Sequence, residues 1–127
     1  MKPMTSEWIA KAEGDFGTMN REIRTRRKPN YDDVCFHAQQ CAEKYLKACM
    51  CEHGIPIAES HDLVSLHAKL ARATQGLREF RAELGLLNAY GVSVRYPGIT
   101  ADRQAAVEAA KLCRLFRKAA RRELGLT

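Results

Sequence analysis

The amino-acid sequence predicts an all-α protein, an up-and-down antiparallel bundle of four long helices and one short helix. Apolar residues recur every three or four positions through most of the 127 residues, and this spacing places them on one face of a helix. The one stretch of alternating character, 91–98, is short, isolated and closed by a Pro-Gly pair, so we expect a loop there and not a strand. At this length the whole chain, 1–127, is expected to form one domain.

The first predicted helix spans about 5–26. Thr5 or Ser6 can cap its start, and a Pro-Asn pair follows its end. An apolar line faces the core and consists of Trp8, Ala12, Phe16, Met19 and Ile23. Gly14 and Gly17 interrupt this line at a cost of about 1 kcal/mol each relative to Ala. Either a neighbouring helix approaches closely there, or the helix is simply weaker.

The second predicted helix, 32–53, is the centre of the bundle. Its apolar positions form two neighbouring stripes, so it should contact other helices on two sides. The remaining face is polar and carries Phe36, Gln40, Glu43, Lys44 and Lys47. On this face Glu43 and Lys47 can pair, because residues four positions apart are neighbours on a helix. A Gly and then a Pro end the helix in the usual order.

Three further helices complete the prediction. Ser60 is the expected cap of a short third helix, and a fourth helix runs from about 77 to 91. The segment 91–98 then carries the chain across the bundle as an extended loop. Thr100 caps the last helix, whose line of small residues lets it pack closely against its neighbours.

The formal charge of +6 and the sequence pI near 9.2 suit an anionic partner such as nucleic acid, but Lys and Arg also form good solvated helix faces. The basic residues of the last helix follow helical spacing, and we interpret them first as a solvated face. They are Arg114, Arg117, Lys118, Arg121 and Arg122.

The five cysteines are an odd number, and four lie within one predicted helix, where disulfide geometry is poor. We expect reduced core residues. No apolar stretch of signal-peptide length or membrane-spanning length occurs, so a soluble cytoplasmic protein that does not enter a membrane is expected.

No metal or cofactor site is predicted. Cys49, Cys51 and His53 are spaced by two residues, and on a helix such positions point to roughly opposite sides, so the three side chains cannot converge on one ion. Paired carboxylates and a nucleotide-cradling glycine loop are also not found in the sequence.

His61 and Asp62 lie at the expected start of the third helix. Backbone N–H groups at such a position favour anions, and a neutral imidazole can donate or accept a hydrogen bond near neutral pH. The alternative is purely local, because both residues can serve as first-turn or capping groups.

Arg95 and Tyr96 precede Pro97, which fixes the local backbone. A guanidinium suits phosphate, and a phenol can stack on a base. The alternative is structural: Tyr96 would plug the end of the bundle, and Arg95 would pair with a carboxylate such as that of Glu43.

Three short motifs follow one another along the chain. They are Phe36-His37-Ala38-Gln39-Gln40 with Glu43-Lys44, then Ser60-His61-Asp62-Leu63, and then Val94-Arg95-Tyr96-Pro97. Through them the chain resembles the HEPN family, the higher eukaryote and prokaryote nucleotide-binding domains, over about 8–116. The resemblance implies a helical bundle, commonly a homodimer, that is often encoded beside a minimal nucleotidyltransferase with which it forms a toxin-antitoxin type pair.

The resemblance also implies a set of site residues on one pocket. The ligand-binding set is Gln40, Lys44, Lys47, His61, Asp62, Arg95 and Tyr96, with Glu43 and Pro97 in a structural network. Many members of the family are RNases whose signature is an Arg followed by a His after four to six residues, late in the domain. No histidine follows His67 in this chain, so the resemblance here points away from the usual RNase activity.

Three hypotheses about function remain. The first is a module with little or no catalysis that binds a nucleotide or RNA and works with a minimal nucleotidyltransferase. The second is a metal-independent RNase toxin that uses His61 and Arg95 as catalytic residues. The third is a protein-interaction or dimerisation module only. None of them requires a cofactor.

Overall fold

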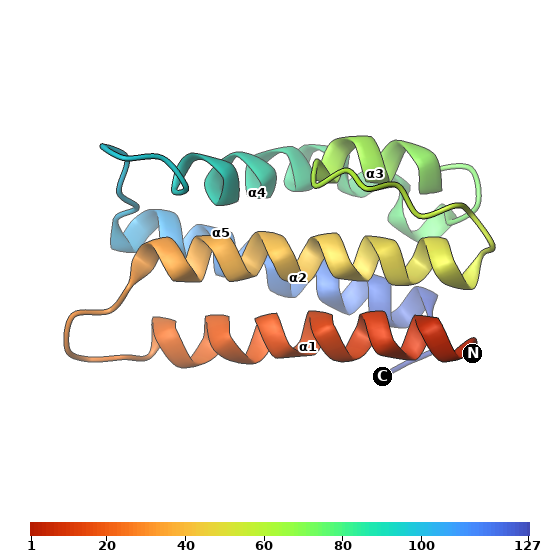
Figure 1. Ribbon diagram of the computed structural model, residues 1–127, viewed down its shortest axis with the longest axis horizontal. Helices are drawn as coiled ribbons and strands as arrows, with labels where there is room; N and C mark the ends of the chain where they lie inside the picture. Colours follow the sequence, from red (N-terminus) through yellow and green to blue (C-terminus); the bar gives the residue numbers. More distant parts are fainter.

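The structure is a computed structural model that describes residues 1–127. Its elements are α1 (Pro3–Ile23), α2 (Tyr31–Glu52), α3 (Leu63–Leu70), the 3-10 helix η1 (Gln75–Phe80), α4 (Arg81–Ser93) and α5 (Arg103–Glu123). The four long helices alternate in direction along the long axis of the molecule, and α3 lies beside α2 and α4 (Figure 1). The predicted all-α bundle of four long helices and one short helix is therefore confirmed. None of these helices combines the length and the apolar character needed to cross a membrane.

The helix α2 is the hub of the bundle. It packs against α1, α3, α4 and α5, whereas α1 and α4 do not pack against each other. Figure 1 shows why, because α1 lies on one side of α2 and α3 and α4 lie on the other. One strip of α2 therefore lies between α1 and the α3–α4 side. This strip is the polar face that the helical spacing predicts.

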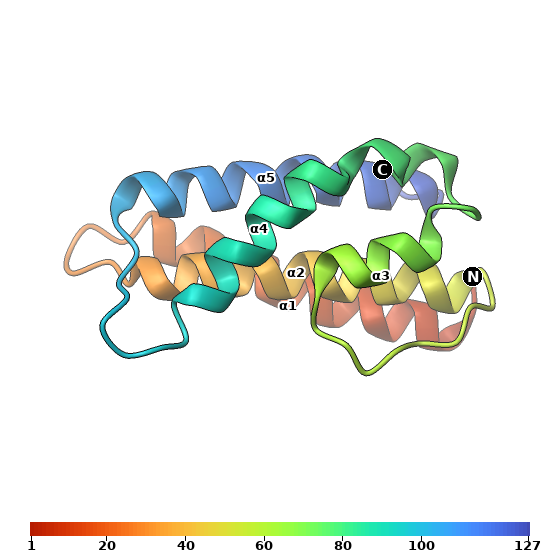
Figure 2. The same ribbon diagram turned by 90° about the horizontal axis from the view of Figure 1, so that it is seen from above.

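The core is one cluster of 24 buried residues drawn from all the helices. α5 contributes mainly small side chains to it, among them Ala106, Ala109 and Cys113, and Figure 2 shows α5 running alongside the rest of the bundle. All five cysteines are free thiols, and four of them are buried. Burial raises the pKa of Cys35 to about 11 and that of Cys49 to about 12, because an apolar environment disfavours the thiolate.

The start of α1 differs from the prediction. The helix begins at Pro3, since proline lacks the N–H that the first turn leaves unpaired and has a helical φ angle. Thr5 does not cap the helix. It is buried, and its hydroxyl donates a hydrogen bond of 2.9 Å to Oε1 of Glu52. The predicted cap thus ties the start of α1 to the end of α2.

The caps of α3 and α5 also differ from the prediction, and at both helices an Asp takes the place of the expected hydroxyl residue. Asp62 rather than Ser60 caps α3, and its carboxylate accepts from the backbone N–H of Val64 at 3.1 Å. Asp102 rather than Thr100 caps α5 and accepts from the N–H of Ala105 at 2.8 Å. A carboxylate at this position adds the attraction of a negative charge to the helix dipole, which a hydroxyl does not.

The predicted fourth helix and the extended loop after it have different boundaries in the structure. The segment 77–91 divides into η1 and α4, and α4 continues to Ser93, so the expected extended crossing of 91–98 is wrong. Hydrogen bonds from the N–H of Arg95 to the carbonyl of Val92 and from Tyr96 to Ser93 keep the next residues in turns. The positive φ angle of Gly98, 86°, then reverses the chain before α5.

Close approach of two helices occurs at Gly91 and not at the glycines of α1. A Cβ atom on Gly91 would lie 2.3 Å from Cβ of Gln39 and 3.3 Å from the carbonyl oxygen of Cys35. Around Gly14 there is open space, and only the side chain of Arg21 lies near Gly17. Of the two interpretations of the α1 glycines, close approach of a neighbouring helix is therefore wrong.

Candidate functional site

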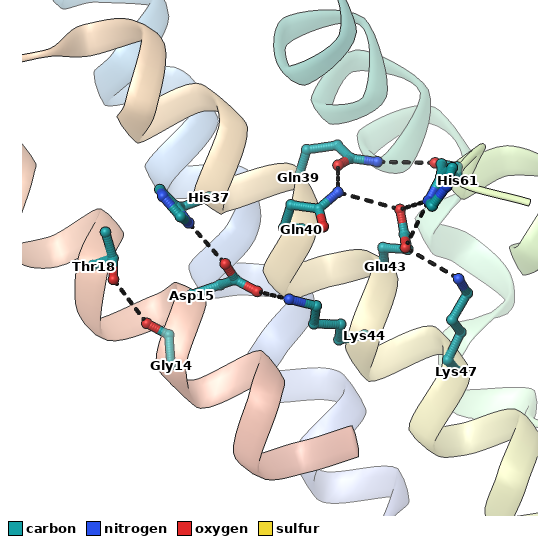
Figure 3. A network of polar contacts seen from close by, with 10 residues as sticks. All are labelled: Gly14, Asp15, Thr18, His37, Gln39, Gln40, Glu43, Lys44, Lys47 and His61. Atoms are coloured by element: carbon teal, nitrogen blue, oxygen red, sulfur yellow. Dashed lines mark hydrogen bonds and ion pairs between the residues drawn. The ribbon is translucent and has the colours of Figure 1, made fainter. Parts of the chain in front are cut away.

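The polar strip of α2 carries two groups of hydrogen-bonded side chains (Figure 3). The Glu43 cluster comprises Gln39, Gln40, Glu43 and Lys47 of α2 and His61 of the segment before α3. The Asp15 cluster joins Asp15 of α1 to His37 and Lys44 of α2.

Glu43 is the centre of its cluster and is almost fully buried, with 3% of its surface exposed. Nζ of Lys47 donates to its Oε2 at 3.1 Å, which confirms the predicted pair at four residues' spacing. Nε2 of Gln40 lies 3.4 Å from its Oε1, and Nδ1 of His61 lies 3.2 and 3.1 Å from its two oxygens. Several partners are needed because an unpaired buried carboxylate is very costly.

His61 is fixed at two points but remains exposed. A carboxylate can only accept hydrogen bonds, so Nδ1 of His61 carries the proton that faces Glu43. The backbone carbonyl of His61 also accepts from Nε2 of Gln39 at 2.9 Å. Even so, 68% of the His61 side chain is exposed, and Nε2 makes no hydrogen bond within the protein. The imidazole is therefore oriented with one nitrogen available to an external group.

Trp8 of α1 borders the same cluster. Nζ of Lys47 lies 5.6 Å from the centre of its indole ring, and its Nε1 is buried without a hydrogen-bond partner. Buried indole N–H groups usually have a partner. Trp8 is predicted only as a core residue, so its place beside the cluster was missed. Gln39 was also missed as a member of the site, although it stands in the first motif.

Lys44 belongs to the other cluster. Its Nζ donates to Oδ2 of Asp15 at 2.5 Å, and Nδ1 of His37 lies 2.7 Å from Oδ1 of the same carboxylate. Figure 3 shows Lys44 directed toward α1 while Lys47 and Glu43 approach His61. Neither Asp15 nor His37 was predicted as a site residue, although His37 stands in the first motif.

The Arg95 segment lies further along the same strip. The guanidinium of Arg95 lies 5.0 Å from the ring centre of Phe36 and makes no ion pair, so the structural alternative, in which Arg95 pairs with a carboxylate such as that of Glu43, is wrong. Tyr96 is 60% exposed and thus does not plug the bundle end. Pro97 is exposed in the turn that follows. Asp62 takes the local role that was the alternative for it, as the cap of α3.

A second, partly buried network joins α1, α2 and α5 away from this strip. Glu13 of α1 accepts two hydrogen bonds from Arg117 at 2.7 and 2.6 Å and one from the phenol of Tyr45 at 2.5 Å. Arg121 in turn donates to the Tyr45 oxygen at 3.1 Å. The hydrogen bonds from Arg117 hold the pKa of Glu13 below its ordinary value, and burial raises the pKa of Tyr45. Arg117 and Arg121 are therefore structural partners and not part of a solvated face.

The sequence matches the model of the HEPN domain over residues 5–123. The chain belongs to the HEPN domain family. Its fold is similar to that of TT1696 from Thermus thermophilus, with a TM-score of 0.82, 20% identity, and coverage of 96% of this chain and 99% of that one. It is also similar to ST0689, an archaeal HEPN homologue, with a TM-score of 0.69, 22% identity, and coverage of 97% and 99%. A search of curated proteins finds no match.

Within this HEPN domain the motif residues divide into three places. Gln40, Glu43, Lys47 and His61 come together, Lys44 turns to α1, and Arg95 stacks on Phe36 one helical turn before Gln40. Three surface cavities of about 240, 570 and 440 Å³ lie elsewhere, and no predicted site residue lines them. A ligand on the polar strip of this HEPN protein would therefore lie across a shallow surface.

Proposed function

We propose that this HEPN protein binds the phosphate of a nucleotide or RNA on the polar strip of α2 and works beside a minimal nucleotidyltransferase in a toxin-antitoxin type pair. The observation that carries the binding proposal is the His61 imidazole, which the buried Glu43 holds with Nε2 directed away from its carboxylate. A protonated imidazole donates from Nε2 to a phosphate oxygen, and charge-assisted hydrogen bonds of this kind are among the stronger ones.

Charge on the strip supports an anionic ligand. Glu43 is balanced by Lys47 and Asp15 by Lys44, so the two ion pairs are neutral. Arg95 has no acidic partner and adds a positive charge beside Phe36. A cation that no carboxylate of the strip neutralises favours an anionic ligand such as a phosphate.

The shape of the strip supports an extended ligand. Phe36 and Glu43 are seven residues apart on α2, which is about 10 Å along a helix axis. The exposed ring of Tyr96 follows Arg95 at the Phe36 end and offers a surface on which a base can stack. A phosphate at His61 and a base near Tyr96 would span this strip.

The binding proposal is tested by replacing His61 with Ala. His53→Ala is the matched control, because His53 is exposed at the end of α2 and has no side-chain partner. Titrations with AMP and with a short single-stranded RNA at low salt should show binding that His61→Ala weakens roughly tenfold or more, the loss expected for one charge-assisted hydrogen bond. No binding by the wild type, or equal binding by both variants, would reject the proposal.

The partner proposal rests on the family alone and needs its own experiment. The HEPN protein would be co-expressed with a minimal nucleotidyltransferase encoded beside it, and the two should co-elute in size-exclusion chromatography. Separate elution at micromolar concentrations would argue against the pairing. A complex that forms while AMP and RNA do not bind would instead favour a pure interaction module.

A metal-independent RNase is the second candidate, and the Glu43–His61 pair favours it. An imidazole oriented by a carboxylate is a common general base, and Arg95 lies on the same strip. Such an enzyme would cleave RNA in the presence of EDTA, would lose activity in His61→Ala and would keep it in His53→Ala. RNA that stays intact with pure wild-type protein would exclude this activity.

A further inference from the structure

Positive charge is unevenly distributed over this molecule. Segments 3–23 and 31–62 together contain ten Asp or Glu and four Lys or Arg. α5 alone contains seven Lys or Arg and two Glu, and the connection between α1 and α2 contributes Arg24, Arg26, Arg27 and Lys28 without an acidic residue. The net charge of +6 is therefore concentrated on α5 and on the turn that follows α1.

Arg103 is exposed in the first turn of α5, and the six other basic residues of the helix divide into two groups. Arg117 and Arg121 point to Glu13 and Tyr45, as described above. The other group is exposed, lacks any carboxylate within ion-pair distance, and is spaced by three or four residues so that it forms one row. This α5 row consists of Lys111, Arg114, Lys118 and Arg122.

The α5 row is continuous with the basic end of α1. Asn20 accepts a hydrogen bond from Arg114 at 2.8 Å through its side chain and one from Arg24 at 3.0 Å through its backbone carbonyl. From Lys111 to Arg122 the row extends about 16 Å along the helix. It shares no residue with the Glu43 cluster, and α5 lies behind α2 in Figure 1.

We propose that the α5 row and the adjoining α1–α2 turn form a docking surface for the sugar-phosphate backbone of RNA. Unpaired cations at regular spacing release counterions when they meet a repeating polyanion, and this release provides a large part of the binding free energy. The inference extends the proposed function by naming a polymer rather than a mononucleotide as the ligand. Its contacts to the RNA backbone would be additional to the phosphate contact of His61 on the strip of α2.

An acidic protein partner fits this surface less well. Protein interfaces have an apolar centre from which charged residues are depleted. The exposed apolar residues of α5 are Val107 and Leu115, and each stands singly near the charged residues of the row. A helix face with four unpaired cations and no apolar centre matches a nucleic-acid backbone better than a protein surface.

The test compares two triple variants that remove the same charge. Lys111→Gln, Lys118→Gln and Arg122→Gln neutralise the row, whereas Lys11→Gln, Lys69→Gln and Arg72→Gln neutralise three exposed cations elsewhere that have no ion pair. Gln keeps a high helix propensity, and circular dichroism and thermal melting would verify the fold of both. Anisotropy titrations would use a labelled single-stranded RNA, and AMP would be titrated in parallel.

The row variant should bind RNA at least about tenfold more weakly. The slope of log K against log salt concentration should become about 2 less steep, since each of the three lost phosphate contacts to a single strand contributes about 0.7. The control variant and AMP binding should change little. Equal losses in the two triple variants, or a wild type that binds no RNA, would overturn the inference. Polyglutamate bound as tightly as RNA would overturn it too and would assign the row to an acidic protein. RNA binding that depends on the row when AMP does not bind would support it and reject only the α2 proposal.

Discussion

Two carboxylates of this HEPN protein, Glu13 and Glu43, differ in what surrounds them. Glu13 accepts hydrogen bonds from Arg117 and Tyr45, and these contacts join α1, α2 and α5. Glu43 is more buried, but one of its partners is the exposed imidazole of His61. Glu13 therefore stabilises the bundle, whereas Glu43 also orients a group that an external ligand can reach.

Glu13 should make folding sensitive to acid. Its pKa is lowered in the folded state by hydrogen bonds from Arg117 and Tyr45, so its contribution to stability is present above the unfolded-state pKa and is lost as the pH falls through the lower folded-state pKa. Glu13→Gln should therefore lower the free energy of unfolding at neutral pH by about 1 kcal/mol, a small value because the group is partly exposed.

Urea unfolding at neutral pH and at a series of decreasing acidic pH values would measure this effect. The free energies of unfolding of the wild type and Glu13→Gln should differ at neutral pH and approach each other as the pH falls. A difference that stays constant across this range would show that the loss comes from packing and not from the ionised carboxylate.

At the scale of the element, α2 is the part that the sequence predicts best. Its predicted span, 32–53, differs by one residue at each end from the observed Tyr31–Glu52, since its apolar stripes are long and Gly54 takes the positive φ angle that ends a helix. Its polar face was predicted too. Helical spacing could not say which neighbour lies on each side of that face, so the separation of Lys44 from Lys47 needed the structure.

The ends of the other helices were less predictable for a similar reason. Ser60 and Asp62 are both good caps. Oδ1 of Asn88 in α4 accepts a hydrogen bond of 3.1 Å from the N–H of Leu63 and so helps to fix Leu63 as the first residue of α3. Such a contact joins residues 25 positions apart. The position of Arg95 over Phe36 likewise depends on how α4 ends against α2.

Two glycine substitutions test the packing of the elements. Gly91→Ala should destabilise the protein by about 1–3 kcal/mol, the usual cost of overpacking, because the new Cβ would meet Gln39 at 2.3 Å. Gly14→Ala is the control within an open helix and should stabilise it by up to about 1 kcal/mol. Thermal melting or urea unfolding would give both values. A neutral Gly91→Ala would contradict the close α2–α4 contact.

At the scale of the whole molecule, the HEPN bundle has two polar surfaces of different character. The strip of α2 contains balanced ion pairs around an oriented histidine, and the α5 row contains unpaired cations. The all-α fold and the family follow from periodicity and three motifs, because both depend on local spacing. The division of basic residues on α5 between a structural network and an exposed row depends on where Glu13 and Tyr45 lie, and no spacing rule contains that information.

The central claim is that a phosphate ligand binds at Nε2 of an imidazole whose Nδ1 is held by Glu43. Side-chain ¹H–¹⁵N spectra of the histidines, with His61 assigned through His61→Gln, would test it most directly. The account predicts a neutral His61 ring that carries its proton on Nδ1 and that loses this fixed tautomer in Glu43→Gln. It also predicts that the Nε2 resonance shifts when AMP or a short RNA is added. A His61 resonance that stays unchanged while the ligand is fully bound would contradict the account.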